Sequence, residues 1–234
     1  MNFYSIADLT VGLEPRYPML RERCKPYLCK KSGVTDYVIT TQTCELAELA
    51  ARTPGATEEV LEYLHVGTLF YSALIRHHGL MLHSSAVVVN GACYAFSADK
   101  GVGKSTQTAL WLREFADRGA YILNDDKPAL KLENGSFYAW GTPFSGVKDL
   151  SVNGSAPLKA IAFVQRSPTN TIERLAPMQA IPLLFKQTIR PADETLMNLL
   201  LDTVQQLVEK VPLFLLRCNR EADAAHMAYE AMNQ

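Results

Sequence analysis

The chain has 234 residues, 48% of them hydrophobic, enough to bury a sizeable core as one α/β-sized domain with a small appendage. Its 23 lysines and arginines nearly balance its 24 acids, and a net charge of −1 argues against a nucleic-acid partner. Asp8 and Glu14 stand where a signal peptide would be basic or apolar, and no run approaches the roughly 18 apolar residues of a membrane span. We therefore expect a cytoplasmic protein without a membrane partner.

Residues 1–78 are predicted to form a small N-terminal α+β region that begins with short strands. Strand-like patterns cover 3–13 and 36–42, and a proline-containing segment ending at Pro26 lies between them. Thr57 is followed by two glutamates, a favourable helix start because the hydroxyl caps free amides and the acids face the positive end of the helix dipole. We expect this helix to reach about residue 78 and stop at Gly79.

A hairpin is predicted next, around Asn90-Gly91. Both residues tolerate the positive φ of a tight turn, and apolar runs flank them at 81–89 and 92–97. The helical pattern of 104–119 ends at a glycine and precedes a short buried strand, 120–126. Because a hairpin immediately precedes the segment 97–106, the sheet is expected to be mixed rather than purely parallel.

The remainder of the chain completes an α/β domain predicted to span residues 79–234. Asn134-Gly135 and Asn153-Gly154 are two further hairpin signals. After them the pattern predicts a strand, a helix, a second strand and a final helix, at 158–165, 193–210, 212–218 and 221–232.

The segment "SADKGVGKST" matches a phosphate-binding loop in which alanine replaces the first glycine. In such a loop successive main-chain amides and the helix N-terminus wrap an anion, the lysine reaches the β- and γ-phosphates, and the following hydroxyl meets Mg²⁺. A chance Gly-Lys-Ser turn is the alternative, and the position between a strand and an amphipathic helix argues against it. The predicted nucleotide-binding residues are Ala98, Asp99, Lys100, Gly101, Val102, Gly103, Lys104, Ser105 and Thr106.

Two consecutive acids, Asp125 and Asp126, end the strand that follows the loop helix. A crossover connection is expected to return this strand beside the loop strand, which places the acids near the phosphates. Because adjacent strand residues point in opposite directions, one acid would hold Mg²⁺ together with Ser105 and the other would face an acceptor hydroxyl. A polar strand-end turn is the alternative.

His83 in "LHSSAVVVNG", the loop "SADKGVGKST" and the pair in "NDD" together resemble the C-terminal catalytic domain of HPr kinase/phosphorylase, a group related to phosphoenolpyruvate carboxykinase. The resemblance covers about residues 80–150. It implies a mixed-sheet P-loop kinase domain, nucleotide and metal binding at Lys104 and Ser105, and a transfer centre at His83, Asp125 and Asp126. It also implies a reverse reaction with inorganic phosphate. A lone histidine beside a strand is otherwise more often structural.

The sequence departs from that family in two places. Ala98, Asp99 and Lys100 replace its usual Gly-x-Ser loop opening. The first 75 residues do not resemble its regulatory domain, so HPr itself is not the expected substrate. A phosphoenolpyruvate carboxykinase is disfavoured by the short chain and by the lack of a recognisable oxaloacetate site.

The predicted function is therefore transfer of the γ-phosphate of ATP, or of another nucleoside triphosphate, to a hydroxyl. Catalysis would use Asp125, Asp126, His83 and Lys104, with Mg²⁺ on Ser105, Asp125 and Asp126. The acceptor would be a serine in a small protein or peptide, or a small molecule, and a homo-oligomer is compatible with the sequence. The alternative is a nucleotide-binding regulatory or assembly protein with little or no turnover.

Other residues carry weaker signals. Arginines can neutralise a transferring phosphate, although most arginines on α/β domains are solvated. The five cysteines are odd in number and irregularly spaced, which favours reduced thiols over a disulfide framework. The arginines considered are Arg166, Arg174, Arg190 and Arg217.

Overall fold

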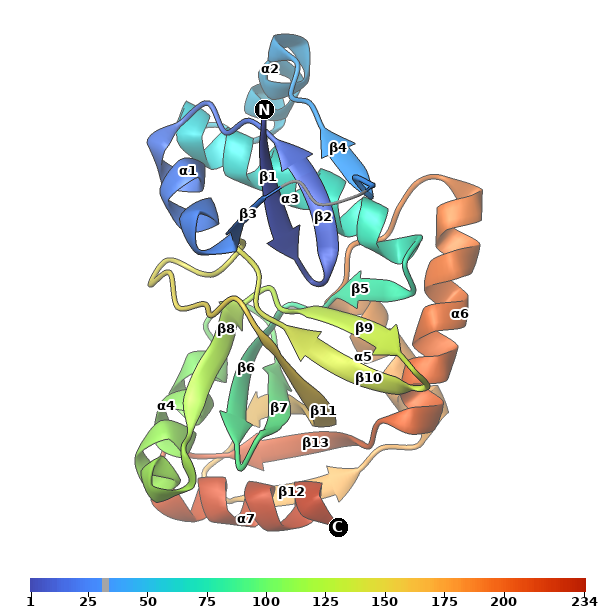
Figure 1. The fold of residues 1–234 in the computed structure, drawn as a ribbon. Coiled ribbons are helices and arrows are strands. Elements are labelled where there is room, and N and C mark those ends of the chain that lie inside the picture. The colour runs from blue at the N-terminus through green and yellow to red at the C-terminus, as the bar shows by residue number, and fades with distance from the viewer. Residues whose placement is uncertain (31–33) are drawn as a thin grey trace.

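The computed structural model describes residues 1–30 and 34–234, and it is a mixed α/β structure with two sheets (Figure 1). The smaller sheet has the strand order β3-β1-β2-β4. The larger has nine strands, in which the path β5-β9-β10-β11-β7-β6-β8 is joined at β11 by β13 and then β12. None of the helices in the described ranges is long and apolar enough to cross a membrane.

The N-terminal region contains the small sheet and three α-helices. Its strands are β1 (Asn2–Ile6), β2 (Leu9–Leu13), β3 (Leu28–Cys29) and β4 (Tyr37–Ile39). Its helices are α1 (Pro18–Cys24), the 3-10 turn η1 (Lys25–Tyr27), α2 (Thr43–Arg52) and α3 (Glu58–Ile75). The predicted cap is confirmed, because the Thr57 side chain accepts a hydrogen bond from the Val60 amide. The prediction of short strands with turns missed α1 and α2, and α3 ends at Ile75, before residue 78.

The larger sheet is built from strands in the rest of the chain, with helices on both faces. The strands are β5 (Gly79–Met81), β6 (Ser84–Val89), β7 (Ala92–Ser97), β8 (Tyr121–Asp126), β9 (Ala129–Glu133), β10 (Ser136–Trp140), β11 (Ser155–Arg166), β12 (Thr171–Arg174) and β13 (Leu213–Cys218). The helices are α4 (Lys104–Glu114), the 3-10 turn η2 (Ala116–Arg118), α5 (Pro177–Lys186), α6 (Glu194–Lys210) and α7 (Ala222–Asn233).

Alternation along the central strands separates two hydrophobic cores. In β6, Ala86 and Val88 belong to the core that contains residues of α5 and α6, whereas Val87 and Val89 face the core that contains residues of α4 and α7. This is the two-residue period of a strand that is buried on both faces. A third core joins α3 and the small sheet to Met81, Ala129 and Phe144.

The hairpin predicted at Asn90-Gly91 is confirmed. Strands β6 and β7 are antiparallel with Val89 opposite Ala92, and the two turn residues have φ values of 50° and 75°. The hairpin at Asn134-Gly135 is confirmed in the same way by the pairing of β9 with β10. Both turns use the positive φ that asparagine and glycine tolerate.

The hairpin predicted at Asn153-Gly154 is wrong. Strands β10 and β11 pair antiparallel with Trp140 opposite Ser155, so the loop between them contains residues 141–154. Gly141 donates a main-chain hydrogen bond to Gly154 at 3.0 Å, and a Cβ at position 141 would lie 1.8 Å from the Val152 carbonyl. The glycines therefore close the base of a long loop instead of a two-residue turn.

The predicted position of the crossover strand is also wrong in one respect. Strand β8 pairs with β6 rather than with the loop strand β7, because β6 and β11 already flank β7. Both β8 and β7 are antiparallel to β6, so they run in the same direction with one strand between them. Asp125 and Asp126 therefore still lie at the sheet end where β7 enters the loop, opposite Ser85 and Ser84.

Candidate phosphate-loop site

The segment between β7 and α4 contains two glycines in conformations that few other residues adopt. Gly101 has a φ of 81°, and Gly103, which caps the N-terminus of α4, has a φ of 140°. Residues with a Cβ rarely adopt these angles, so glycine is needed at both positions. The first amides of α4 lack acceptors within the helix and carry its partial positive charge, which makes this end of the helix suited to phosphate.

Lys104 is buried at the start of α4, with 8% of its surface exposed. Its Nζ donates to the Ala98 carbonyl at 2.9 Å and lies 3.1 Å from His83 Nε2. Burial lowers the pKa of the Lys104 ammonium, and the negative charges of Asp126, Asp125 and Asp99 oppose that effect. The side chain of Lys104, which the sequence predicts to reach the phosphates, is bonded here to the main chain at the start of the loop.

Ser105 and Asp125 bring two oxygen-bearing side chains together. The Ser105 hydroxyl donates to the Asp125 carboxylate, at 3.1 Å from Oδ1 and 3.3 Å from Oδ2. Asp125 is 8% exposed, and its main-chain N–H donates to Leu150 O at 2.9 Å, which fixes the end of β8. A carboxylate and a hydroxyl beside a phosphate loop are hard oxygen donors of the kind that Mg²⁺ prefers.

Asp126 lies between two cationic or protonatable groups. Its Oδ1 is 3.2 Å from His83 Nε2, and its Oδ2 accepts from Lys127 Nζ at 2.5 Å. Burial raises the pKa of this carboxyl, but the contact with the His83 ring and the charge and hydrogen bond of Lys127 outweigh it and hold the pKa well below the usual value. Asp126 also has a φ of 121°, a strained conformation for a residue with a side chain.

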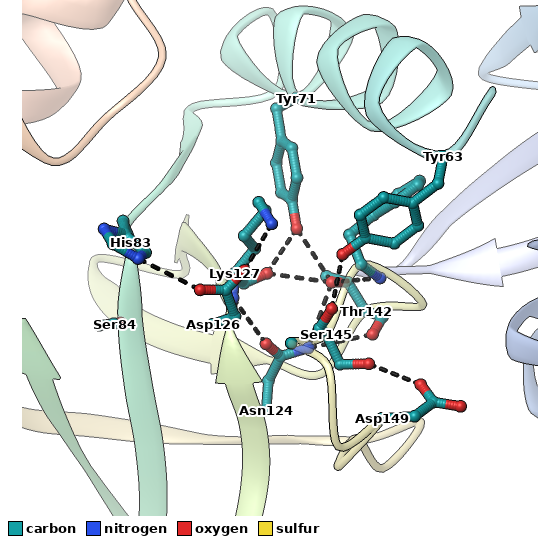
Figure 2. A network of polar contacts seen from close by, with 12 residues as sticks. Tyr63, Tyr71, His83, Ser84, Asn124, Asp126, Lys127, Thr142, Ser145 and Asp149 are labelled. Atoms are coloured by element: carbon teal, nitrogen blue, oxygen red, sulfur yellow. Dashed lines mark hydrogen bonds and ion pairs between the residues drawn. The ribbon is translucent and has the colours of Figure 1, made fainter. Parts of the chain in front are cut away.

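A network of hydrogen bonds holds the turn that carries Asp126 (Figure 2). The side chain of Asn124 accepts from the Lys127 amide at 2.9 Å and donates to the Thr142 carbonyl at 3.0 Å. From α3, the Tyr71 hydroxyl donates to the Lys127 carbonyl and lies 2.9 Å from Thr142 Oγ1. The N-terminal helix α3 therefore helps to hold Asp126 in its strained conformation.

Tyr63, also on α3, approaches the same turn. Its hydroxyl donates to the Ser145 carbonyl at 2.6 Å, as Figure 2 shows, and its ring lies 5.3 Å from Lys127 Nζ. The Arg23 guanidinium is 4.9 Å from the centroid of the Tyr63 ring and donates to the Ser145 carbonyl at 2.9 Å. Residues from the N-terminal region thus contact the acidic turn directly.

His83 is held on its other side by Gln187, which follows α5. The His83 ring Nδ1 is 2.8 Å from Gln187 Oε1, and the His83 N–H donates to the Gln187 carbonyl at 2.7 Å. Gln187 Nε2 in turn donates to Asp99 Oδ1 at 2.8 Å, and Lys186 Nζ donates to Asp99 Oδ2 at 2.6 Å. A chain of contacts therefore runs from the opening of the loop to His83.

Two cavities, each of about 490 Å³, flank the loop. The first lies beside the first turn of α4, where Thr106 and Gln107 meet the ends of β11 and β13. The second lies beside Asp99 and Lys100 and reaches α5. Arg166 lines both cavities, and its guanidinium donates to the Val102 carbonyl at 2.9 Å and to the Gly101 carbonyl.

The structure brings together most of the residues predicted from the sequence. Lys104 and Asp126 lie beside His83, and Ser105 meets Asp125. Among the arginines considered, Arg166 contacts the loop, whereas Arg217 pairs with Glu173 across β12 and β13 at 2.9 Å. All five cysteines are free thiols, as predicted.

Sequence reasoning missed Lys127 and Gln187. Lys127 directly follows the acidic pair, so a cation adjacent to two carboxylates was an available signal. Gln187 is more than 100 residues from His83, as their separation of 104 shows, and no local pattern indicates that they meet. Across the described part of the chain, no group of three or more His, Cys, Asp or Glu side chains is arranged to hold a metal ion.

Comparison with known proteins gives one family match. Residues 43–223 match the family described as "SynChlorMet cassette protein ScmC". No curated protein matches the chain. Among solved structures, the HPr(Ser) kinase/phosphatase from Coxiella burnetii is similar with a TM-score of 0.38 and 13% identity, over 66% of this chain and 99% of that one. A likeness this distant assigns no role to any residue.

Proposed function

The chain belongs to the ScmC family of SynChlorMet cassette proteins, and we propose that it is a nucleotide-dependent kinase that transfers the γ-phosphate of ATP to a hydroxyl group. One observation carries the proposal: beside the loop, Ser105 contacts Asp125, and Lys104 contacts His83, which in turn contacts Asp126. Phosphoryl transfer depends mainly on positioning and on stabilising negative charge, and this site combines loop amides, cations and carboxylates.

The nucleotide would occupy the loop and the cavity beside α4. The loop amides and Lys104 would contact the β- and γ-phosphates, and Thr106 would lie near the α-phosphate. The first cavity has room for a nucleoside and is lined by Val102, Val164 and other side chains near the ends of β11 and β13. Its continuity with the first turn of α4 supports this placement.

A magnesium ion fits Ser105 and Asp125 better than Asp126. The Ser105 hydroxyl contacts the Asp125 carboxylate directly, whereas the Asp126 oxygens already contact Lys127 and His83. Mg²⁺ is commonly bound by one or two carboxylates together with substrate phosphates, so two protein ligands are enough. When bound, the ion would neutralise charge that develops on the transferring phosphate.

Asp126 is then the acid that faces the acceptor. Its low pKa makes it a weak base, so its carboxylate would mainly orient the acceptor hydroxyl and would take the proton late, once the forming O–P bond has made that proton acidic. The bond from the γ-phosphorus to the β–γ bridging oxygen breaks in the same step, and ADP leaves. Lys127 and Lys104 would stabilise the negative charge on either side of the transferring group.

The proposed acceptor is a serine in a small protein or peptide, or a small hydroxyl compound. The family name describes its members as proteins of a cassette, so the other products of that cassette are the first acceptors to test. The second candidate is a nucleotide-binding regulatory or assembly protein with little turnover. The separate surroundings of Asp125 and Asp126 favour the kinase, because binding alone needs only one metal-holding acid.

The deciding experiment is transfer of label from γ-labelled ATP with Mg²⁺ to the cassette's proteins and peptides and to free serine. A kinase gives a labelled acceptor and ADP in equal amounts, and Asp126→Asn removes both products. Tight Mg-ATP binding without any labelled acceptor supports the regulatory protein instead. A protein that binds no nucleotide contradicts both.

A further inference from the structure

Gln187 contacts His83 through both its main chain and its side chain. It is 8% exposed and directly follows the C-terminal end of α5. Its main-chain N–H donates to the Leu184 carbonyl at 2.9 Å. Thr188, the next residue, donates from its hydroxyl to the Met81 carbonyl at 2.5 Å. The backbone on both sides of the Gln187 side chain is therefore held by hydrogen bonds, and this side chain has little freedom to move away from the His83 ring.

Asp99 determines which way the Gln187 amide group faces. The hydrogen bonds from Lys186 and Gln187 lower the pKa of the Asp99 carboxyl, so this group is ionised at neutral pH and can only accept hydrogen bonds. The partner at 2.8 Å must therefore be the NH₂ group of Gln187. This leaves Gln187 Oε1 facing the His83 ring.

An amide oxygen can only accept, so His83 Nδ1 must carry a hydrogen. The tautomer of a neutral histidine is set by the hydrogen bond that its other nitrogen makes. With the hydrogen on Nδ1, the Nε2 atom presents its lone pair to Lys104 Nζ at 3.1 Å, beside Asp126. The charged or titratable groups around the ring are thus Lys104 from α4, Asp126 from β8, Lys127 behind Asp126, and Asp99 beyond Gln187.

We propose that Gln187 is a positioning residue which, oriented by Asp99, holds His83 in the Nδ1–H tautomer and so keeps Nε2 free to exchange a proton at the transfer centre. Without Gln187, the Asp126 carboxylate is the strongest acceptor near the ring, and it would draw the hydrogen to Nε2. In that arrangement the Nε2–H group of His83 would donate to the Asp126 carboxylate, and no lone pair of the ring would face Lys104. The role of Gln187 in phosphoryl transfer rests on the proposed function, whereas the tautomer of His83 does not depend on it.

The tautomer can be measured without nucleotide or acceptor. In long-range proton–nitrogen correlation spectra of the ¹⁵N-histidine-labelled full chain, the cross-peak pattern shows which ring nitrogen is protonated. The His83 signals are identified by their loss in His83→Gln. We expect Nδ1–H in the wild type and a shift to Nε2–H in Gln187→Met, a variant of similar size that can neither donate nor accept strongly.

Two further variants test the contacts of Gln187 and Asp99 one at a time. Gln187→Glu keeps an acceptor for Nδ1 but loses the donor to Asp99, so it should retain Nδ1–H. Lys186→Ala removes the other partner of Asp99 and should leave the tautomer unchanged. Circular dichroism and thermal unfolding confirm that each variant folds, and if Gln187→Met does not fold, Gln187→Leu and Asp99→Leu replace it, both with Nε2–H expected.

The outcomes are decisive in either direction. A wild-type ring with Nε2–H, a doubly protonated ring throughout the pH range in which the protein is folded, or an unchanged tautomer in Gln187→Met overturns the proposal. Where acceptor labelling is detected, Gln187→Met should lower kcat at least about tenfold with little change in KM for ATP. Failure to label any acceptor would count against the proposed function and would leave the tautomer result intact.

Discussion

The hydroxyl of Ser105 donates to the Asp125 carboxylate at 3.1 Å, which joins the first turn of α4 to the end of β8. Strand β6 separates β8 from the loop strand β7, so this contact spans the N-terminal end of β6, opposite the turn of the hairpin. The neighbouring acid, Asp126, contacts His83 and Lys127 instead. The two acids therefore have different partners, and their variants should fail in different ways.

Asp125→Asn should weaken Mg²⁺-dependent nucleotide binding, because the amide replaces the carboxylate that contacts Ser105. Asp126→Asn should still bind Mg-ATP but lose phosphoryl transfer by at least about a hundredfold, the lower range for a positioned acid or base. Titration calorimetry with Mg-ATP and a label-transfer assay measure the two effects. Equal Mg-ATP affinity in wild type and both variants would contradict the division of roles.

Lys104→Met should abolish most of the thermal stabilisation by ATP, since the ligand stabilises the folded state only in proportion to its binding. Methionine keeps much of the buried volume of Lys104 but loses the ammonium that bonds Ala98 and faces His83. Lys148→Met, at an exposed position, is the matched control. Full ATP stabilisation in a folded Lys104→Met protein would argue against phosphate binding at this loop.

Asp126→Gly should be more stable than Asp126→Ala. Both variants remove the carboxylate and leave Lys127 without it, but only glycine adopts a φ of 121° at low cost. Strain of this kind costs on the order of 1–3 kcal/mol, and the greater entropy of glycine in the unfolded chain offsets about 0.4–1 kcal/mol. We expect a net difference of roughly 1 kcal/mol in urea unfolding; an alanine variant of equal or greater stability would show that the backbone is unstrained.

The Asp126 carboxylate should contribute to stability at neutral pH and lose that contribution in acid. Its pKa in the folded protein lies below the unfolded value of about 3.9, so the contribution is complete above that pH and declines as the pH falls further. The difference in unfolding free energy between wild type and Asp126→Asn should therefore shrink below about pH 4. Asp117→Asn, at an exposed position, serves as the control, and a pH-independent difference for Asp126→Asn would rule the effect out.

Arg166→Gln should weaken nucleotide binding about tenfold, because its guanidinium fixes two consecutive loop carbonyls and a charged hydrogen bond contributes about 1.5–3 kcal/mol. Arg217→Gln removes a neighbouring strand-end arginine that pairs with Glu173, and should leave binding unchanged. Calorimetry with Mg-ATP compares the two. If both variants bind equally well, Arg166 has no special role at the loop.

The sequence indicated the local parts of the site and missed those that depend on distant segments. The loop, the Asn90-Gly91 turn and the acidic pair could be recognised because glycine, asparagine and strand-end acids have local physical meaning. The position of β8 could not, since nothing in its residues shows whether it pairs with β6 or β7. Gln187 likewise meets His83 only because α5 packs on the sheet, and the strain at Asp126 depends on tyrosines from α3.

Strand β11 of the larger sheet pairs with three other strands. Its first residues pair with β10, Leu158–Phe163 pair in parallel with β7, and Ile161–Arg166 pair in parallel with β13. The amide groups of residues 161–163 lie in the part of β11 that is paired with β7 and β13 at once, so their hydrogen exchange should require opening of the whole sheet rather than fraying of an edge. The loop strand and the C-terminal strands are therefore expected to unfold in one cooperative step, and a partly opened protein that keeps the loop between β7 and α4 intact should be scarcely populated.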